Sequence, residues 1–589
     1  MSVTCTPAVS TEGRIAGVSG PVVVARGLAG VRLYNVVEVG PRRLPGEVIR
    51  LEGDTAVIQV YESTTGLRAG DPVADTGHPL QVELGPGLLG GIYDGTQRPL
   101  AVLAREGDDP YGVPMLPTGG DAPALDREHR WTFEPAVAEG DEVGPGDVLG
   151  TVRETAAVVH RVLVPADVRG AVTSVHPGSA TVEQAVVEVG GRPVTMLRRS
   201  AVREARPHAG ELTADEPLIS GQRVIDALFP VARGGVAAIP GGFGTGKTVL
   251  ETSLAKWADA DVVVYVACGE RGNELAEVLE EFPTLEDPRT GESLMQRTVL
   301  IANTSNMPVA AREASVYTGI TIAEFFRDQG YDVALMADST SRWGEALREV
   351  SSRLEEVPAE EGYPAYLATR LAEFYERAGR VRCLGRDEHS GSITVVGAVS
   401  PPGGDFSEPV TQHSLRLAGA FWALDAELAR QRHFPAIDPA RSYTLYDLGP
   451  WFAEHVAEEW PALRRWALER LGEERGLLEM VALLGTDALD GPQQVSLRSG
   501  RTLRETFLAQ SAFDAHDAHT APAVQYAMLR TLRASATAML AAVEGGMPAD
   551  DVLAAGSLKG LGAMRRWNEA DAADAADAAI DAIEEELSA

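Results

Sequence analysis

The stretch Val236–Leu250, VAAIPGGFGTGKTVL, decides how this chain is organised. It begins with a short apolar run and ends in residues that favour a helix. The eight residues between fit the pattern G-x-x-x-x-G-K-[ST]. They are Gly241, Gly242, Phe243, Gly244, Thr245, Gly246, Lys247 and Thr248. This strand, loop and helix pattern predicts a loop that holds the phosphates of a nucleotide such as ATP or ADP.

Each residue type in this loop has a chemical role in binding phosphate or Mg²⁺. Glycines let backbone N–H groups close around phosphate oxygens, and the following helix adds the positive end of its dipole. Lys247 reaches the β- and γ-phosphates, and the Thr248 hydroxyl is a ligand for Mg²⁺. The alternative is a chance glycine-rich turn. The chain has three lysines, Lys247, Lys256 and Lys559, so a chance match is rare.

Two further strands end in polar residues. The run Asp261–Cys268 reads as a buried strand and is followed by Gly269, Glu270 and Arg271. The run Asp332–Asp338 is a second apolar strand that ends in a carboxylate. Ligand groups in parallel sheets gather at the carboxyl ends of strands, so we expect these residues and the loop to converge on one site.

These strand ends supply candidate catalytic groups. Glu270 is placed to orient or deprotonate the water that attacks the γ-phosphate, although a solvated loop glutamate is the alternative. Asp338 would hold Mg²⁺ directly or through water; its alternative is a helix N-cap before Thr340. Arg271 and Arg342 would neutralise phosphate charge, or form surface ion pairs instead.

Two aromatic residues are candidates for binding the base. Phe434, in RHFPAI, and Phe513, in QSAFD, would each stack on adenine; the alternative for an isolated phenylalanine is the core. His516 and His519, with Asp514 and Asp517 between or beside them, could make a metal site on a helix, but no further ligands are evident.

Composition excludes some functions. With 85 acidic and 52 basic residues the net charge is −33, which argues against non-specific binding to nucleic acid or to anionic membranes. Three isolated cysteines, Cys5, Cys268 and Cys383, indicate a reducing compartment without disulfides. No apolar run is long enough to span a membrane, and the first residues lack a signal-peptide core. We therefore expect a cytoplasmic protein.

Patterning divides the chain into four parts. Short strands broken by turns predict an N-terminal β-barrel, and a second β-rich stretch repeats a turn-and-strand unit typical of a barrel-sandwich. That stretch resembles biotinyl and lipoyl carrier domains, but residues 1–246 contain no lysine for attachment. Alternating strands and helices predict an α/β domain, followed by helices. The predicted boundaries are 1–75 for the barrel, 110–190 for the β-rich insertion, 76–109 with 191–440 for the nucleotide domain, and 441–589 for the helical domain.

The C-terminal residues, ADAADAADAAIDAIEEELSA, predict an amphipathic helix. Asp571, Asp574, Asp577 and Asp581 lie near one face and Ile580, Ile583 and Leu587 form a narrow apolar stripe. Its aspartates predict a solvated helix, with docking of a partner as the alternative.

Taken together, these motifs resemble the catalytic A subunit of V-type and archaeal or bacterial A-type rotary ATPases. The resemblance runs nearly end to end and includes PGGFGTGKTVL, ACGERGNELAEVLEEFP, SPPGGDFSEPVTQHSL and RHFPAI. The insertion separates this family from the type III secretion ATPases and from the β chain of F-type synthases. Thr245 stands where some relatives have cysteine, so a redox switch at that position is absent.

The resemblance implies a multidomain fold: an N-terminal β-barrel, a β-rich insertion, a central RecA-like P-loop domain and a C-terminal helical bundle. It implies that Lys247, Thr248 and Asp338 bind Mg-ATP, that Glu270 activates water, that Arg271 and Arg342 contact phosphate, and that Phe434 and Phe513 flank adenine.

It also implies an assembly in which three such chains alternate with three non-catalytic B-type subunits, which supply an arginine in trans, together with central and peripheral stalk subunits. The complex would couple ATP turnover to proton or sodium transport, with this chain peripheral on the cytoplasmic face of the cell membrane and in contact with the membrane only through its partners.

Two other functions fit a P-loop chain. A hexameric RecA-like nucleic-acid translocase of the termination-factor type is opposed by the acidic balance, the insertion and the helical region. A non-catalytic regulatory role is opposed by the presence of Lys247, Thr248, Glu270 and Asp338 together. We therefore expect no nucleic-acid partner.

Overall fold

The computed structural model describes residues 12–100, 122–485 and 488–588. The chain divides into two compact units: unit 1 comprises 1–212 and 260–395, and unit 2 comprises 213–259 and 396–589. Residues 1–11 of the predicted barrel, the segment 101–121 around the start of the predicted insertion, and Cys5 lie outside the described residues. The predicted nucleotide domain is shared between the two units.

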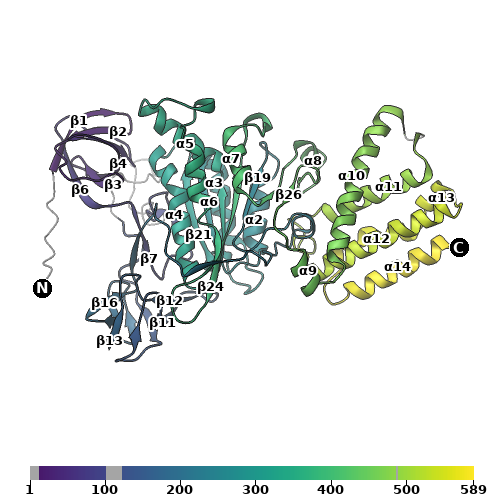
Figure 1. The fold of residues 1–589 in the computed structure, drawn as a ribbon, viewed down its shortest axis with the longest axis horizontal. Helices are drawn as coiled ribbons and strands as arrows, with labels where there is room; N and C mark the ends of the chain where they lie inside the picture. Colours follow the sequence, from purple (N-terminus) through teal and green to yellow (C-terminus); the bar gives the residue numbers. More distant parts are fainter. Residues whose placement is uncertain (1–11, 101–121, 486–487, 589) are drawn as a thin grey trace. The chain divides into compact units, whose positions relative to one another are not determined.

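The N-terminal part of unit 1 is a closed six-stranded barrel, as predicted (Figure 1). Alternate side chains of its strands, such as Val37 and Val39, are fully buried and fill the interior. Around the barrel the strand order is β1, β2, β5, β4, β3, β6. The bounds are β1 (Glu12–Ser19), β2 (Val22–Arg26), β3 (Asn35–Val39), β4 (Leu44–Glu52), β5 (Thr55–Val60) and β6 (Pro72–Pro79).

The insertion consists of two four-stranded sheets. Gly140 and Gly146, in the repeated turns, both have positive φ, which explains why glycine occurs at these turns. One sheet orders its strands as β10 (Glu142–Val143), β13 (Gly170–Val175), β15 (Ala185–Val189) and β16 (Arg192–Thr195). The other orders them as β12 (Val159–Leu163), β11 (Val148–Arg153), β9 (Trp131–Pro135) and β14 (Gly178–Ala180).

The α/β part of unit 1 is a parallel sheet covered by helices. Residues Val262–Cys268 of β20 are all buried, as expected for a strand with both faces covered. β20 pairs in parallel with both β21 and β22, so their carboxyl ends share one edge. The strand order is β24 (Ser390–Val399), β22 (Asp332–Asp338), β20 (Val262–Glu270), β21 (Thr298–Thr304) and β8 (Ile92–Tyr93). The helices are α3 (Gly272–Glu281), α4 (Val309–Asp328), α5 (Thr340–Arg353) and α6 (Leu367–Tyr375). The remaining strands of unit 1 are β7 (Gln81–Leu84), which pairs with β17 (Arg198–Ala201), and β18 (Gly210–Leu212), which pairs with β23 (Gly379–Arg382).

A buried arginine, Arg203, connects the barrel to helix α4, which covers this sheet. The Arg203 guanidinium donates to Glu47 on β4 at 2.9 Å and to Glu313 on α4 at 2.7 Å. Burial raises the pKa of Glu47, and Arg203 opposes that rise. Because both carboxylates depend on one cation, Arg203 fixes the barrel on α4.

Unit 2 contains a small sheet and the helical bundle. β19 (Val236–Pro240) pairs in parallel with β25 (Ala420–Phe421), which pairs with β26 (Tyr443–Thr444). The helices are α2 (Lys247–Trp257), α7 (Pro409–Leu417), α8 (Ala426–Arg430), α9 (Gly449–His455), α10 (Trp460–Leu484), α11 (Gly491–Thr502), α12 (Pro522–Glu544), α13 (Ala549–Leu553) and α14 (Ala572–Ser588). The C-terminal region is therefore helical, as predicted.

The predicted C-terminal helix is α14, and it packs along α12 (Figure 1). Ile583 and Leu587 of its apolar stripe are buried, while Asp577 forms an ion pair with Arg530 of α12. The aspartates Asp571, Asp574 and Asp581 are exposed. The helix is thus amphipathic, and its apolar stripe lies against the chain's own bundle.

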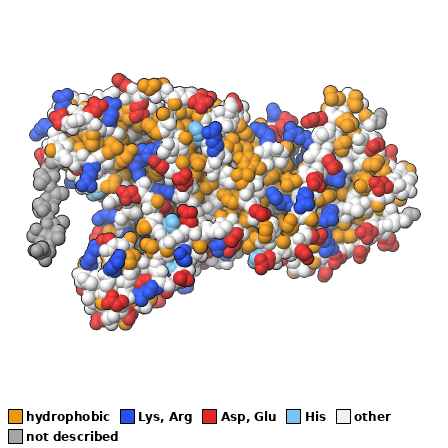
Figure 2. All heavy atoms as spheres, viewed as in Figure 1, with side chains coloured by type: hydrophobic (Ala, Val, Ile, Leu, Met, Phe, Trp, Pro, Cys, Tyr) orange, Lys and Arg blue, Asp and Glu red, His pale blue; other side chains and the backbone are white. Residues whose placement is uncertain are grey.

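Acidic and basic side chains are interspersed on the face shown in Figure 2. Among the described residues, no helix has the length and apolar character needed to cross a bilayer. Cys268 and Cys383 are both buried free thiols. Burial raises the pKa of the Cys268 thiol to about 12, so it stays protonated and unreactive.

Candidate nucleotide-binding site

The predicted phosphate loop connects β19 to α2 in unit 2. Gly244 and Gly246 have positive φ angles of 74° and 87°, which residues other than glycine rarely adopt. The Lys247 ammonium donates to the carbonyl oxygens of Gly241 and Gly242 at 2.7 and 3.0 Å. Thr248 is exposed in the first turn of α2, and the Phe243 ring is 83% exposed. The loop thus presents glycine backbone, one cation and one hydroxyl at a helix N-terminus, which is the donor set that a polyphosphate needs.

The Phe434 ring lies against this loop. A Cβ added at Gly246 would come within 3.4 Å of the ring, so glycine leaves room for it. The ring is 41% exposed, which leaves part of its surface open to a ligand. Phe434 therefore lies beside the phosphate loop, as adenine stacking requires.

Phe513 lies in a turn between Ala509 and Ala521, and its ring is 87% exposed. The turn is attached to the Phe434 segment because the Gln510 N–H donates to the Phe434 carbonyl at 2.7 Å. The Ser511 N–H donates to Asp517 Oδ2 at 2.8 Å, which closes the turn on itself. An exposed aromatic side chain on an anchored turn is available to a ligand.

A fully buried arginine holds this turn. Arg223 forms an ion pair with Asp517 at 2.7 Å, and its backbone N–H donates to Gln510 Oε1 at 2.8 Å. Its guanidinium also donates to the Phe507 and Ala509 carbonyls at 2.6 and 2.8 Å and to the Thr520 hydroxyl at 2.9 Å. Since a buried cation needs such partners, the turn and Arg223 depend on each other.

Sequence reasoning did not identify Arg223 or Gln510 as part of the site, and it considered Asp517 only beside the histidine pair. A signal was present: Arg223 stands in RVIDALFPVA, which is apolar apart from Arg223 and Asp226, and charged residues in such a run are candidates for a buried network. Its partners could not be found in this way, because Phe507 is 284 residues away.

Glu270 ends β20 in unit 1, at the carboxyl edge of the parallel sheet. Its side chain is 14% exposed, and Arg342 Nε lies 3.2 Å from its Oε1. Burial, together with the Glu274 and Asp338 carboxylates, raises the pKa of Glu270 to about 8, and Arg342 opposes the rise. A carboxylate that titrates near neutral pH is suited to act as a general base.

The turn before Glu270 requires glycine. Gly269 has a φ of 73°, and an added Cβ would lie 2.9 Å from Arg312 Cδ and 3.0 Å from Arg342 Cβ. Arg312 itself donates to the Ser305 carbonyl at 2.9 Å. The two arginine side chains thus approach the backbone closely beside Glu270. Sequence reasoning identified Arg342 but missed Arg312.

Asp338 ends β22 at the same edge of the sheet and is 4% exposed. The Tyr265 hydroxyl lies 3.4 Å from its Oδ2. Ser339 occupies the N-cap position of α5, so Asp338 does not take that position. Arg271 precedes α3 and is exposed. The structure brings Glu270 and Arg342 into contact; the convergence of all three motifs on one nucleotide stays a prediction.

The histidine pair does not have the geometry of a helical metal site. His516 lies in a turn and His519 in the irregular segment that follows, so the spacing of a helix does not apply to them. The His519 ring stacks on Trp257 at 5.2 Å, and burial lowers its pKa. His519 is therefore a packing residue.

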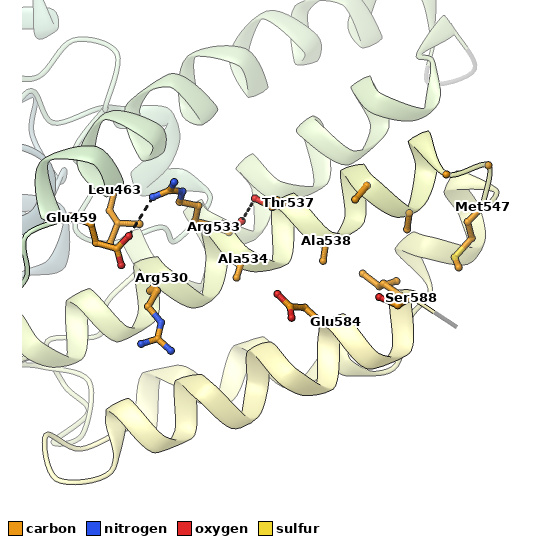
Figure 3. A pocket seen from close by; sticks show the side chains of 15 residues that line it. Glu459, Leu463, Arg530, Arg533, Ala534, Thr537, Ala538, Met547, Glu584 and Ser588 are labelled. Carbon is orange, nitrogen blue, oxygen red and sulfur yellow. Dashed lines mark hydrogen bonds and ion pairs between the residues drawn. The ribbon is translucent and has the colours of Figure 1, made fainter.

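Unit 2 also has a hollow of about 920 Å³ within its helical bundle (Figure 3). Its floor carries small residues of α12, including Ala534 and Ala538, and Arg533 pairs with Glu459 at its edge at 3.5 Å. None of the predicted site residues lines it.

Comparison with protein families defines the class of the chain. Residues 221–444 match the nucleotide-binding domain of the ATP synthase alpha/beta family. Residues 15–77 match the beta-barrel domain of that family and residues 122–203 its barrel-sandwich domain. Residues 449–549 match the C-terminal domain of V and A type ATP synthases. The fold and the phosphate loop are thus those of an ATP synthase alpha/beta chain.

Comparison with individual proteins shows which subunit within this family the chain resembles. The A subunit of the A-type ATP synthase of Haloferax volcanii is 56% identical over 574 residues, which cover 96% of this chain and 97% of the relative. Those of Methanopyrus kandleri and Thermococcus onnurineus are each 56% identical, covering 92% of this chain and 92% and 93% of their own lengths. The chain belongs to the family of A-type ATP synthase A subunits, so its enzyme class is ATP synthase or ATP hydrolase.

Proposed function

We propose that the chain is the catalytic subunit of a rotary ATP synthase or ATPase and that it turns over Mg-ATP. The observation that carries the proposal is the combination of an intact phosphate loop with a partly buried Glu270 paired to Arg342. A carboxylate whose pKa is raised by burial and by Asp338 is suited to take a proton from water, which supports a catalytic role for Glu270.

In the proposed reaction, Lys247 and the glycine backbone bind the β- and γ-phosphates, and Arg271 and Arg342 balance charge on the γ-phosphate. Glu270 orients the attacking water and takes its proton. The water oxygen bonds to the γ-phosphorus while the bond to the β-bridging oxygen breaks, giving ADP and phosphate. Synthesis is the reverse, with Glu270 returning the proton.

The donor set of this chain fits Mg²⁺. Thr248 offers a hydroxyl and Asp338 a carboxylate, the oxygen ligands that Mg²⁺ prefers alongside phosphates and water. Among the described residues there is no cluster of three or more His, Cys, Asp or Glu side chains, the kind of set that binds a metal without substrate. When bound, Mg²⁺ supplies charge neutralisation on the phosphates. We propose that Thr248 and Asp338 hold it, Asp338 partly through water.

The base would lie between Phe434 and Phe513. Support comes from the Phe434 ring beside Gly246 and from the exposed Phe513 on its anchored turn. Arg223 and Asp517 contact neither base nor phosphate in this proposal; they are positioning residues that hold the turn.

The curated relatives are named as components of ATP synthases, which supports membership of a multisubunit complex. We propose three of these chains alternating with three B-type subunits that supply an arginine in trans, together with central and peripheral stalk subunits. The complex would transport protons or sodium ions, with this chain on the cytoplasmic side of the membrane.

The test is Mg-ATP turnover by the purified chain, first alone and then mixed with the B-type and stalk subunits of the same organism. We expect low activity alone and a rise when the mixed ring forms, because the trans arginine completes the site. Full activity alone that partners do not change would contradict the proposal. Stimulation by nucleic acid would favour the translocase instead.

A further inference from the structure

A second hollow, of about 300 Å³, lies in unit 1 outside every residue placed in the nucleotide site. Its walls come from the insertion strand β12 and the segment after it, from β17 and the following residues, and from the end of α4. Four arginines line it: Arg161, Arg198, Arg199 and Arg206.

Arg198 has hydrogen bonds but no carboxylate partner among the described residues. Its guanidinium donates to the carbonyl oxygens of Leu163 and Leu197 at 3.2 and 3.3 Å. A guanidinium has five N–H donors, so donors remain for a ligand. Burial and the neighbouring Arg206 lower the pKa of Arg198 to about 10, and the Asp167 carboxylate opposes that shift.

Arg161, which also lines the hollow, likewise has no carboxylate partner among the described residues. It donates to the Gln329 carbonyl and lies 5.7 Å from the centre of the Tyr331 ring, and no ion pair to it is found in the described part of the chain. Two arginines without carboxylate partners in one hollow are unexpected in a chain with a net charge of −33.

The carboxylates that line the hollow do not balance these charges. Asp328 is shared between Arg206 and Arg327, with both distances 2.7 Å. Asp167 forms its ion pair with Arg192 at 2.8 Å and acts on Arg198 only from a longer distance. Glu204 is exposed.

We propose that this hollow binds a small anion that carries a phosphate group, held by Arg198 with Arg161 and Arg206. The arginine fork matches phosphate oxygens in a bidentate manner, and a phosphate provides more acceptors than a carboxylate. The volume, at the lower end of ligand pockets, suits inorganic phosphate, pyrophosphate or a nucleoside monophosphate rather than a macromolecule.

Calorimetric titration of the full chain tests this. The chain carries Lys247→Ala to weaken phosphate binding at the nucleotide loop, and it is titrated separately with inorganic phosphate, pyrophosphate and AMP. At least one of the three should bind, and the strongest identifies whether the free anion or a phosphomonoester is preferred. Adding Arg198→Met should weaken that binding by about 10-fold or more.

Arg153→Met in the same background is the matched control, because Arg153 is exposed at the end of β11 and loses the same charge outside the hollow. It should leave binding within about 2-fold of the parent. No binding of any of the three ligands would overturn the proposal. So would binding that Arg198→Met leaves unchanged, or that Arg153→Met weakens equally.

A second measurement avoids the risk that Arg198→Met does not fold. Phenylglyoxal modifies accessible arginines, and peptide mass spectrometry reports the modification of Arg198 in the chain that retains it. Pyrophosphate should protect Arg198 and leave Arg153 reactive. Equal modification of Arg198 with and without saturating pyrophosphate, phosphate or AMP would refute the site.

Discussion

The phosphate loop and the turn that carries Phe513 belong to the same unit but are held in different ways. Lys247 bonds to loop carbonyls five and six residues away, so the loop is shaped largely by its own sequence. The Phe513 turn is held by Arg223, whose partners are 284 to 297 residues distant. The difference teaches that the loop proposed to bind phosphate is encoded locally in this chain, whereas the turn proposed to bind the base depends on a tertiary network.

The largest effect should come from Glu270→Gln. The amide keeps the shape of the side chain but cannot take a proton, so turnover in the assembled complex should fall by about 10²- to 10⁴-fold. ATP affinity should stay within a few-fold, because the loop and the Phe513 turn are untouched. Single-turnover kinetics together with equilibrium binding measure both quantities. Near-normal turnover would remove Glu270 from its proposed role.

The next largest effect should come from removing Arg223, whose hydrogen bonds and ion pair hold the turn that carries Phe513. Arg223→Met leaves Asp517 buried without its cation, which should destabilise unit 2 by about 3–5 kcal/mol. We also expect weaker binding of ATP with little change for tripolyphosphate, which has no base. Thermal denaturation and calorimetric titration give the two readouts.

Arg203→Met is the matched control for that experiment. It also removes a buried arginine from carboxylate partners, but those partners are Glu47 and Glu313 in unit 1. It should reduce stability without changing the ratio of ATP to tripolyphosphate affinity. If both variants shift this ratio equally, Arg223 has only a structural role.

A smaller effect should appear in the pH profile. In the proposed role Glu270 works as the carboxylate, and burial raises its pKa to about 8, so kcat/KM should rise as pH increases through 8. Arg342 lowers that pKa, so Arg342→Met should move the rise to higher pH. The loss of kcat/KM caused by Arg342→Met should then be greatest near neutral pH and become smaller in more alkaline buffer. A loss that is equal at every pH would mean that Arg342 does not tune Glu270.

Sequence patterns predicted the parts of the fold and site that are local. The barrel, the insertion, the α/β sheet and the helical region follow from turn spacing and apolar periodicity, and Glu270 and Asp338 were visible because each ends a strand. A spacing of three in the histidine pair implies neighbours only on a helix, and neither residue lies on one. Arg223 and Asp517 could not be paired, because nothing local in either segment specifies the other.

One measurement tests the central claim that phosphate and base are held by separate devices. The affinities of ATP and tripolyphosphate are measured for Lys247→Ala and Phe513→Ala. Lys247→Ala should weaken both ligands similarly, whereas Phe513→Ala should weaken ATP by about 5- to 100-fold, the range expected for loss of aromatic stacking on a base, and leave tripolyphosphate unchanged. If Phe513→Ala weakens tripolyphosphate as much as ATP, or leaves ATP unaffected, the division of roles is wrong.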